Sequence, residues 1–159
     1  MSKLEIKIDK TDTVFKIYLL GVVDEEVDFG SYSLSGASSV EMHLDKIKGI
    51  NSCGIREWIR WIGTAGTADI KYSGCPKIIV DQINMVRGFL PDHAKVLSFY
   101  VPYYSNDSGA EKSVLYISGQ HYTAEGELIP PAVKDDDGNL MEMDIVESKY
   151  FKFLKRCIP

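Results

Sequence analysis

The first twenty residues alternate between apolar and polar positions, the pattern of strands that bury one face. Leu4, Ile6 and Ile8 alternate with charged residues, and a second alternating run covers residues 14–20. Together these two runs predict an opening β-hairpin. The acidic, Ser- and Gly-rich residues 24–39 follow no period, so we expect a loop there with at most one helical turn.

The apolar positions then change to a helical period, immediately after a short polar turn at residues 51–54. Asn51 or Ser52 can cap this helix, and Gly54 lets the backbone turn tightly at its start. An apolar stripe follows at the i, i+3, i+4 and i+7 spacing: Ile55, Trp58, Ile59 and Ile62. The free amides of the first turn surround Ser52 and Cys53, which makes this turn a natural reader of added negative charge.

Strands and helices continue to alternate up to about residue 101. An apolar strand covers residues 40–45 before the polar turn, and short strands are expected at residues 68–73 and 96–101. Between the last two, Pro76 suits the first position of a second helix, whose apolar stripe is formed by Ile79, Ile83, Val86 and Leu90. This order predicts an α/β fold with a mixed sheet and helices packed on it.

The chain changes character after residue 101. We therefore divide it into residues 1–101 and an extension, residues 102–159. The extension has polar turns at residues 105–109 and 134–139, with a strand predicted at residues 113–118. Residues 147–157 predict a final amphipathic helix with an apolar side formed by Tyr150, Phe151, Leu154 and Ile158.

Composition narrows the function classes. The chain of 159 residues is 45% hydrophobic and 26% charged, with a net charge of -5. This acidic balance argues against nucleic acid as a partner. No apolar stretch approaches the ~20 residues of a membrane span, and the alternating start is unlike a signal peptide. Three widely spaced cysteines do not suggest a disulfide framework. The expected location is the cytoplasm.

The polar turn and the strand before it carry a family resemblance. Residues 40–45 are an apolar strand ending in Asp45, and Asn51-Ser52-Cys53-Gly54 follows a short loop. This pattern resembles the STAS family of anti-sigma-factor antagonists and sulfate-transporter tails, in which Asp-Ser-Ser-Gly opens the helix. The resemblance implies a regulator that binds a protein, such as a regulatory kinase or an anti-sigma-like partner. The family's phosphoacceptor position is Cys53 here, with Ser52 adjacent, so the usual serine switch is not expected.

The same resemblance implies that the turn and its helix face the partner. We therefore expect the recognition surface to comprise Asn51, Ser52, Cys53, Gly54, Arg56, Arg60 and Trp61. Trp61 is predicted nearer the edge of the helix than Trp58, and a Trp beside arginines is typical of binding hot spots. The alternative for Trp61 is ordinary packing. The acidic residues 24–28 are either a solvated loop or a further partner contact.

The extension resembles, more weakly, a zinc ribbon. Ser105 and Ser108 have the spacing of one Cys-x-x-Cys knuckle, and Lys134 and Asp137 have that of the other. Serine hydroxyls and a lysine cannot supply the thiolate or imidazole donors that structural zinc requires. We therefore expect a ribbon-like shape without a metal.

No pattern predicts catalysis or a cofactor. The three histidines are isolated from one another, and the chain has neither a nucleophile elbow nor a phosphate-binding glycine loop. The leading hypothesis is a non-enzymatic protein-interaction module. Two alternatives stay open: a sensor of a small ligand (a nucleotide, a lipid or an anion) at the helix start, and a thiol redox sensor that uses Cys53.

Overall fold

The computed structural model describes residues 4–155, which form two sheets and the helices packed on them. Five strands form one mixed sheet in the order β1-β2-β3-β4-β5: β1 (Glu5–Thr11), β2 (Val14–Val23), β3 (Ser39–Ile50), β4 (Asp69–Ser73) and β5 (Lys95–Val96). β1 is antiparallel to β2, and every later neighbour in this sheet is parallel. The predicted hairpin and the α/β class with a mixed sheet are confirmed.

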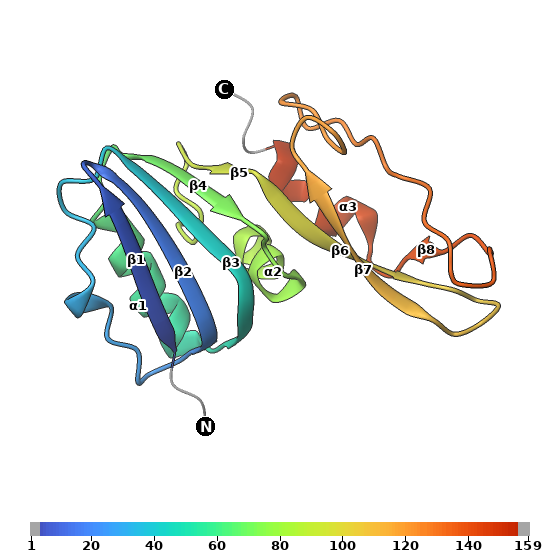
Figure 1. Ribbon diagram of the computed structural model, residues 1–159, viewed down its shortest axis with the longest axis horizontal. Coiled ribbons are helices and arrows are strands. Elements are labelled where there is room, and N and C mark those ends of the chain that lie inside the picture. Colours follow the sequence, from blue (N-terminus) through green and yellow to red (C-terminus); the bar gives the residue numbers. More distant parts are fainter. Residues whose placement is uncertain (1–3, 156–159) are drawn as a thin grey trace.

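Two helices connect the parallel strands and lie on the same face of this sheet (Figure 1). Helix α1 (Ser52–Gly63) joins β3 to β4, and α2 (Lys77–Met85) joins β4 to β5. The loop between β2 and β3 holds one 3-10 turn, η1 (Phe29–Ser31), as expected. No helix of residues 4–155 lies on the opposite face of the sheet, and we call it the open face.

The core lies between the helices and the covered face of the sheet. Phe15, Ile17 and Leu19 of β2 point into it, since alternate residues of a strand share a face. Trp58 of α1 is fully buried and stacks on Phe89 at 5.2 Å between ring centroids. Its indole Nε1 donates a hydrogen bond to the Tyr72 hydroxyl at 3.0 Å. Trp58 and Ile62 of the predicted stripe are buried, whereas Ile55 and Ile59 are only half-buried.

A second, antiparallel sheet follows, in the order β7-β6-β8. Its strands are β6 (Ser98–Tyr104), β7 (Glu111–Ile117) and β8 (Glu142–Met143). The single strand predicted at residues 96–101 is therefore two strands, one in each sheet. The boundary predicted between residues 101 and 102 falls inside β6.

The C-terminal segment differs from the predicted helix. It consists of α3 (Glu147–Tyr150) and a 3-10 turn, η2 (Lys152–Lys155); residues 156–158 lie outside the described residues. Four of its side chains are buried within five positions: Tyr150, Phe151, Phe153 and Leu154. Tyr150, Phe151 and Leu154 are thus buried as the predicted apolar side requires, but the segment is a short α-helix followed by a 3-10 turn and not one continuous helix.

Helix α2 is also shorter than its apolar stripe predicts. It ends at Met85, and Pro76 is the residue before its first turn. Leu90 is buried nonetheless, because the turn after α2 leads back towards the core.

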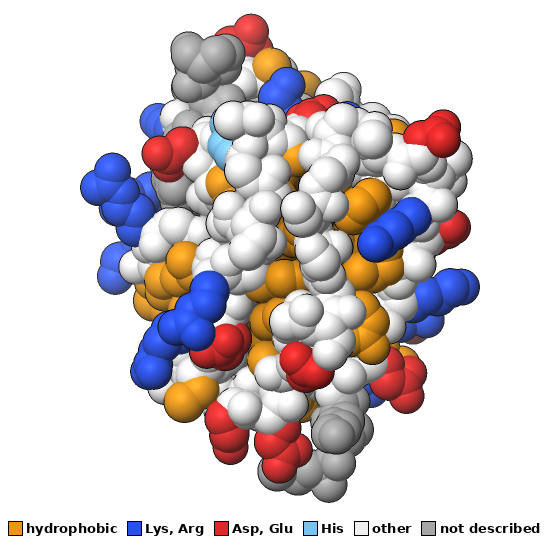
Figure 2. All heavy atoms as spheres, turned by 90° about the vertical axis from the view of Figure 1, so that its left-hand side faces the viewer, with side chains coloured by type: hydrophobic (Ala, Val, Ile, Leu, Met, Phe, Trp, Pro, Cys, Tyr) orange, Lys and Arg blue, Asp and Glu red, His pale blue; other side chains and the backbone are white. Residues whose placement is uncertain are grey.

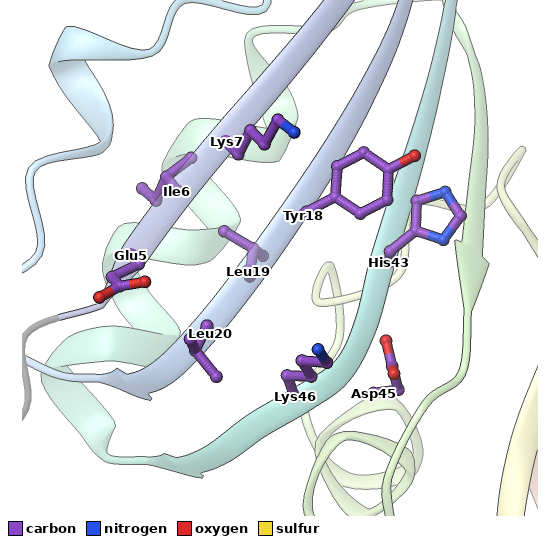
Figure 3. A pocket seen from close by; sticks show the side chains of 9 residues that line it. All are labelled: Glu5, Ile6, Lys7, Tyr18, Leu19, Leu20, His43, Asp45 and Lys46. Atoms are coloured by element: carbon purple, nitrogen blue, oxygen red, sulfur yellow. The ribbon is translucent and has the colours of Figure 1, made fainter.

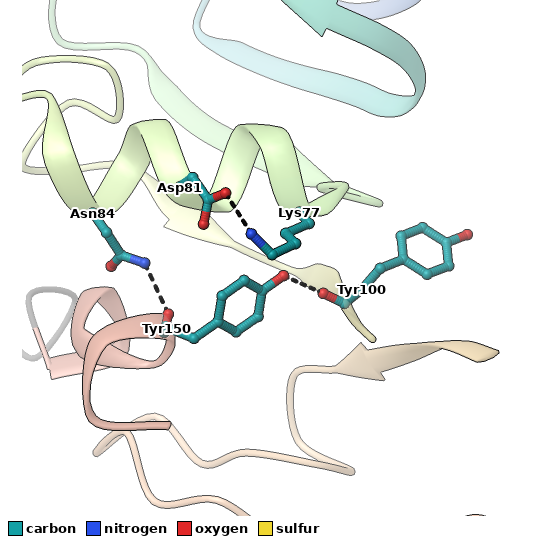
Figure 4. Close-up of polar contacts among 5 residues, drawn as sticks. All are labelled: Lys77, Asp81, Asn84, Tyr100 and Tyr150. Atoms are coloured by element: carbon teal, nitrogen blue, oxygen red, sulfur yellow. Dashed lines mark hydrogen bonds and ion pairs between the residues drawn. The ribbon is translucent and has the colours of Figure 1, made fainter. Parts of the chain in front are cut away.

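Asn84 of α2 fastens the C-terminal segment to the body (Figure 4). Its Nδ2 donates to the Tyr150 carbonyl and its Oδ1 accepts from the Phe153 amide, both at 2.9 Å. The Tyr150 hydroxyl in turn donates to the Tyr100 carbonyl of β6. α2, β6 and the C-terminal segment therefore form one connected unit.

Figure 2 shows the side of the molecule that is on the left in Figure 1, where β1 and α1 lie. Apolar side chains are visible along the middle of this side, and charged side chains of both signs surround them. Within residues 4–155, no helix is long and apolar enough to cross a membrane.

Candidate functional site

The turn Asn51–Gly54 lies where β3 ends and α1 begins, and Asn51 is its cap. Asn51 Oδ1 accepts a hydrogen bond from the Gly54 amide at 2.8 Å. The Asn51 amide donates to the Val23 carbonyl at 3.1 Å, which holds the turn against the end of β2. Of the two caps that the sequence left open, the structure therefore has Asn51 in this position.

Gly54 is buried at the closest approach between α1 and β2. A Cβ atom at this position would lie 2.1 Å from the Val23 carbonyl oxygen and 2.5 Å from its carbon. No real Cβ contact is that short, and backbone atoms cannot move aside as the end of a long side chain can. Glycine is therefore required by packing against β2 and not by the turn conformation that the sequence suggested.

The residues around Gly54 present polar groups to solvent. Ser52 and Arg56 are exposed, and Cys53 is partly exposed. Arg60 lies two turns along the helix, with 71% of its side chain exposed, and its Nη1 is 3.4 Å from Glu57 Oε1. The helix thus leaves Ser52, Arg56 and Arg60 available for contact with another molecule.

The acidic loop, residues 24–28, lies directly beside this turn. Glu25 Oε2 accepts a hydrogen bond from Asn51 Nδ2 at 2.8 Å, and this bond lowers the pKa of Glu25. The same Asn51 side chain therefore caps α1 through its oxygen and holds the loop through its nitrogen. The structure joins the acidic loop and the Asn51–Gly54 turn into one surface.

Trp61 requires a correction, since only 4% of it is exposed. Its ring stacks on Phe29 at 4.2 Å between centroids, and its Nε1 donates to the Tyr32 carbonyl at 2.7 Å. The segment around η1 covers the ring, and a loop without periodicity gave no indication of this in the sequence. Trp61 belongs to the core, and Arg60 is the exposed member of the pair.

A hollow of about 350 Å³ lies next to this stacked pair. Its lining combines the loop with one edge of α1: Phe29, Gly30, Ser33, Glu57, Arg60, Trp61 and Thr64. The exposed guanidinium of Arg60 is at its border. The surface near the helix start is thus both charged and indented.

The cysteines differ in environment. Cys53 is partly exposed in the first turn of α1, and Cys75 is fully buried. Burial raises the pKa of the Cys75 thiol far above its usual value, because a thiolate there would lose its hydration. Cys157 lies outside the described residues. Within residues 4–155, no group of three or more His, Cys, Asp or Glu side chains is arranged to hold a metal ion.

The two turns of the extension meet at Asp135. The sequence favours a solvated turn at residues 135–138, but Asp135 itself is buried, with 6% of it exposed. The hydroxyls of Ser105 and Ser108 both donate to Asp135 Oδ2 at 2.7 Å. Asp135 Oδ1 accepts from the backbone amides of Asp137 at 3.0 Å and Asn139 at 2.9 Å. These hydrogen bonds hold the pKa of the Asp135 carboxyl well below its usual range. We call these five residues the Asp135 cluster.

The sequence predicted Lys134 and Asp137 as the second knuckle, but the residue at the centre of the cluster is Asp135, one position after Lys134. The side chains of Lys134 and Asp137 are exposed; Lys134 contributes its carbonyl to Lys112 Nζ at 2.6 Å. Asp137 contributes only a backbone amide to the cluster. The signal in the sequence was the pair of short polar turns, which the structure does bring together.

No protein-family model matches this chain, and no curated protein matches it in sequence.

Proposed function

We propose that this protein is a non-enzymatic, STAS-like interaction module of the cytoplasm, which recognises a protein partner through the Asn51–Gly54 turn and the exposed side of α1. The observation that supports this most is the double use of Asn51. One side chain caps the helix and holds the acidic loop, so that two candidate contact segments share one rigid surface.

The order of elements also supports the proposal. An antiparallel β1-β2 pair, three parallel strands and two helices on one face accord with the fold that the resemblance implies. At the start of α1, Ser52 is exposed and Cys53 is partly exposed, so these two residues are available to a partner.

The chemistry of the turn favours a constitutive module over a serine switch. Cys53 occupies the position of the family's phosphoacceptor, and it has no hydroxyl to phosphorylate. The turn therefore binds its partner without an added phosphate.

The test is an affinity pull-down from a lysate of the native cells, analysed by mass spectrometry. Wild type is compared with Cys53→Asp, which adds a negative charge in the first turn, where an acidic residue suits the helix dipole and should not disturb folding. Cys53→Ser is the matched control, because it has nearly the same size and no charge. A partner retained by wild type and Cys53→Ser but lost with Cys53→Asp supports recognition at this turn.

Two outcomes would contradict the proposal. One is that Cys53→Asp retains the same proteins as wild type, which would place recognition elsewhere on the molecule. The other is that no version retains a specific protein. A thermal-shift screen against nucleotides, fatty acids and anions would then test the small-ligand alternative.

A further inference from the structure

Among residues 4–155, no helix covers the open face of the five-stranded sheet (Figure 1). β2 contributes a row of apolar side chains to it: Val14, Tyr18 and Leu20 are 37%, 40% and 38% exposed. The Tyr18 ring stacks on His43 of β3, with 4.5 Å between the ring centroids. Neighbouring strands thus present a flat aromatic and aliphatic strip to the outside.

Charged residues of alternating sign surround this strip. The strand register places Asp9, Lys16, Glu41, Lys71 and Lys95 in one row across the sheet. The charged residues of this face are six lysines and five acids: Lys7, Lys16, Lys46, Lys48, Lys71 and Lys95 against Glu5, Asp9, Glu41, Asp45 and Asp69. The open face is therefore close to neutral, and the net charge of -5 comes from the rest of the chain.

The strip borders a shallow hollow of about 590 Å³ (Figure 3). Around it stand two cations, Lys7 and Lys46, and two anions, Glu5 and Asp45. Among residues 4–155, none of these four side chains forms an ion pair or a side-chain hydrogen bond. Lys71 and Asp69, farther across the sheet, already pair with each other at 3.5 Å. The hollow is thus surrounded by charges of both signs that have no partner among the described residues.

From this arrangement we propose that the open face is a homodimer interface, on which a second copy of this chain docks face to face. Two-fold symmetry brings a surface onto itself, so a patch of alternating charges can pair each cation with an anion of the other copy. Two molecules of net charge -5 repel each other elsewhere, and this nearly neutral face escapes that repulsion. Tyr18 and Leu20 supply the apolar contact.

The size of the face sets the expected strength. Four strands about 4.8 Å apart, with about seven residues rising ~3.3 Å each, cover roughly 19 Å by 23 Å. Stable complexes bury about 800 Å² of accessible surface on each partner, and weak ones bury less. The dimer is therefore weak and forms as the concentration rises through the micromolar range.

Sedimentation velocity of the full-length chain from about 5 to about 500 µM tests this proposal. The sedimentation coefficient of wild type should rise with concentration from that of a monomer towards that of a dimer. Lys7→Glu and Leu20→Gln should each weaken association about tenfold or more. Lys149→Glu makes the same charge change on exposed α3 and should leave association unchanged. Added salt should weaken the wild-type dimer, because it screens the charge pairs.

Two results would overturn the proposal. A monomer at every concentration would show that water or another molecule covers the face. Association that neither Lys7→Glu nor Leu20→Gln weakens would place the interface on a different surface. Circular dichroism of each variant shows whether it is folded, and both altered residues are exposed, so their substitution leaves the core intact.

Discussion

The Asn51–Gly54 turn and the Asp135 cluster are both polar, and both fasten segments that are distant in sequence. At Asp135, one carboxylate is only 6% exposed and accepts hydrogen bonds from two hydroxyls and two amides. At Asn51, the connecting side chain is exposed, and Ser52 beside it is exposed as well. The Asp135 cluster is therefore closed to other molecules, and the Asn51–Gly54 turn is open to them.

This difference separates a structural role from a binding role. A carboxylate whose oxygens are fully occupied by donors of its own chain has little to offer a ligand, and the same bonds hold the two turns of the extension together. The Asn51–Gly54 turn keeps exposed donors and acceptors next to a rigid helix. On this comparison, only the open turn is suited to recognise a partner.

The largest expected effect on stability comes from Gly54→Ala, at the close contact between α1 and β2 that holds the open turn in place. Gly54→Ala sets a Cβ atom against the Val23 carbonyl, so α1 must move off β2. We expect a loss of at least about 3 kcal/mol in the free energy of unfolding, measured by urea denaturation.

Gly63→Ala is the matched control for that substitution. Gly63 is the last residue of the same helix, and nothing lies within 4 Å of a Cβ atom there. Alanine at this position should raise stability by up to about 1 kcal/mol, because it is the better helix former. Equal effects of the two substitutions would contradict the packing argument.

The next largest effect is expected at the closed cluster. Asp135→Ala leaves the hydroxyls of Ser105 and Ser108 and two backbone amides without their acceptor. The melting temperature should fall clearly, and amide hydrogen exchange should accelerate in residues 105–110 and 134–140. Asp136→Ala is the control, since this neighbouring carboxylate is exposed. Similar melting temperatures for the two variants would mean that the cluster does not stabilise the extension.

The same cluster predicts a pH dependence. The pKa of Asp135 is lowered in the folded chain, so its stabilisation is complete above the ordinary aspartate pKa of about 3.9 and declines as the pH falls below it. The gap in melting temperature between wild type and Asp135→Asn should therefore narrow from about pH 7 to about pH 3. A gap that stays constant or widens would contradict a stabilising carboxylate.

A smaller effect is expected at the cap. Asn51→Ala removes the acceptor for the Gly54 amide and the donor to Glu25, and caps are worth about 1 kcal/mol. Urea denaturation of Asn51→Ala beside Ser52→Ala measures this difference, since Ser52 is exposed and not the cap. A larger loss for Ser52→Ala would show that the wrong residue has been identified as the cap.

The smallest expected effect is a difference in the labelling rates of two cysteines, which requires no change in the fold. Cys53 is partly exposed, and Cys75 is buried with a raised pKa. At neutral pH, a maleimide should therefore label Cys53 in the folded chain long before Cys75, as peptide mapping by mass spectrometry can show. Labelling of Cys75 at a similar rate would mean that the core opens readily, and it would also remove the basis for a thiol sensor at Cys53.

The sequence predicted the parts of the fold that depend on periodicity. Alternation in β1 and β2 and the stripe of Trp58 and Ile62 are local patterns, and each is set by one buried face. In the C-terminal segment the sequence predicted the burial of Phe151 but not of Phe153, which packs on Phe99 of a distant strand. The split between β5 and β6 is likewise decided by which sheet each half joins.

The sequence predicted which residues form the turn of the candidate site. It did not predict which distant residues pack around that turn. The polar turn before an apolar stripe identified Asn51 and Gly54. The burial of Trp61 depends on Phe29, and the centre of the extension depends on Asp135 meeting two serines about thirty residues earlier. The sequence showed the two polar turns of the extension, but not which of their residues meet.

The most direct test of recognition at the open turn is a pull-down that adds one negative charge to the turn and, as a control, to the extension. Cys53→Asp changes the Asn51–Gly54 turn, and Ser148→Asp makes the same change in net charge on exposed α3 of the extension. We expect the partner of the wild type to be lost with Cys53→Asp and retained with Ser148→Asp. Retention with Cys53→Asp and loss with Ser148→Asp would move recognition to the extension and contradict the proposed role of the turn.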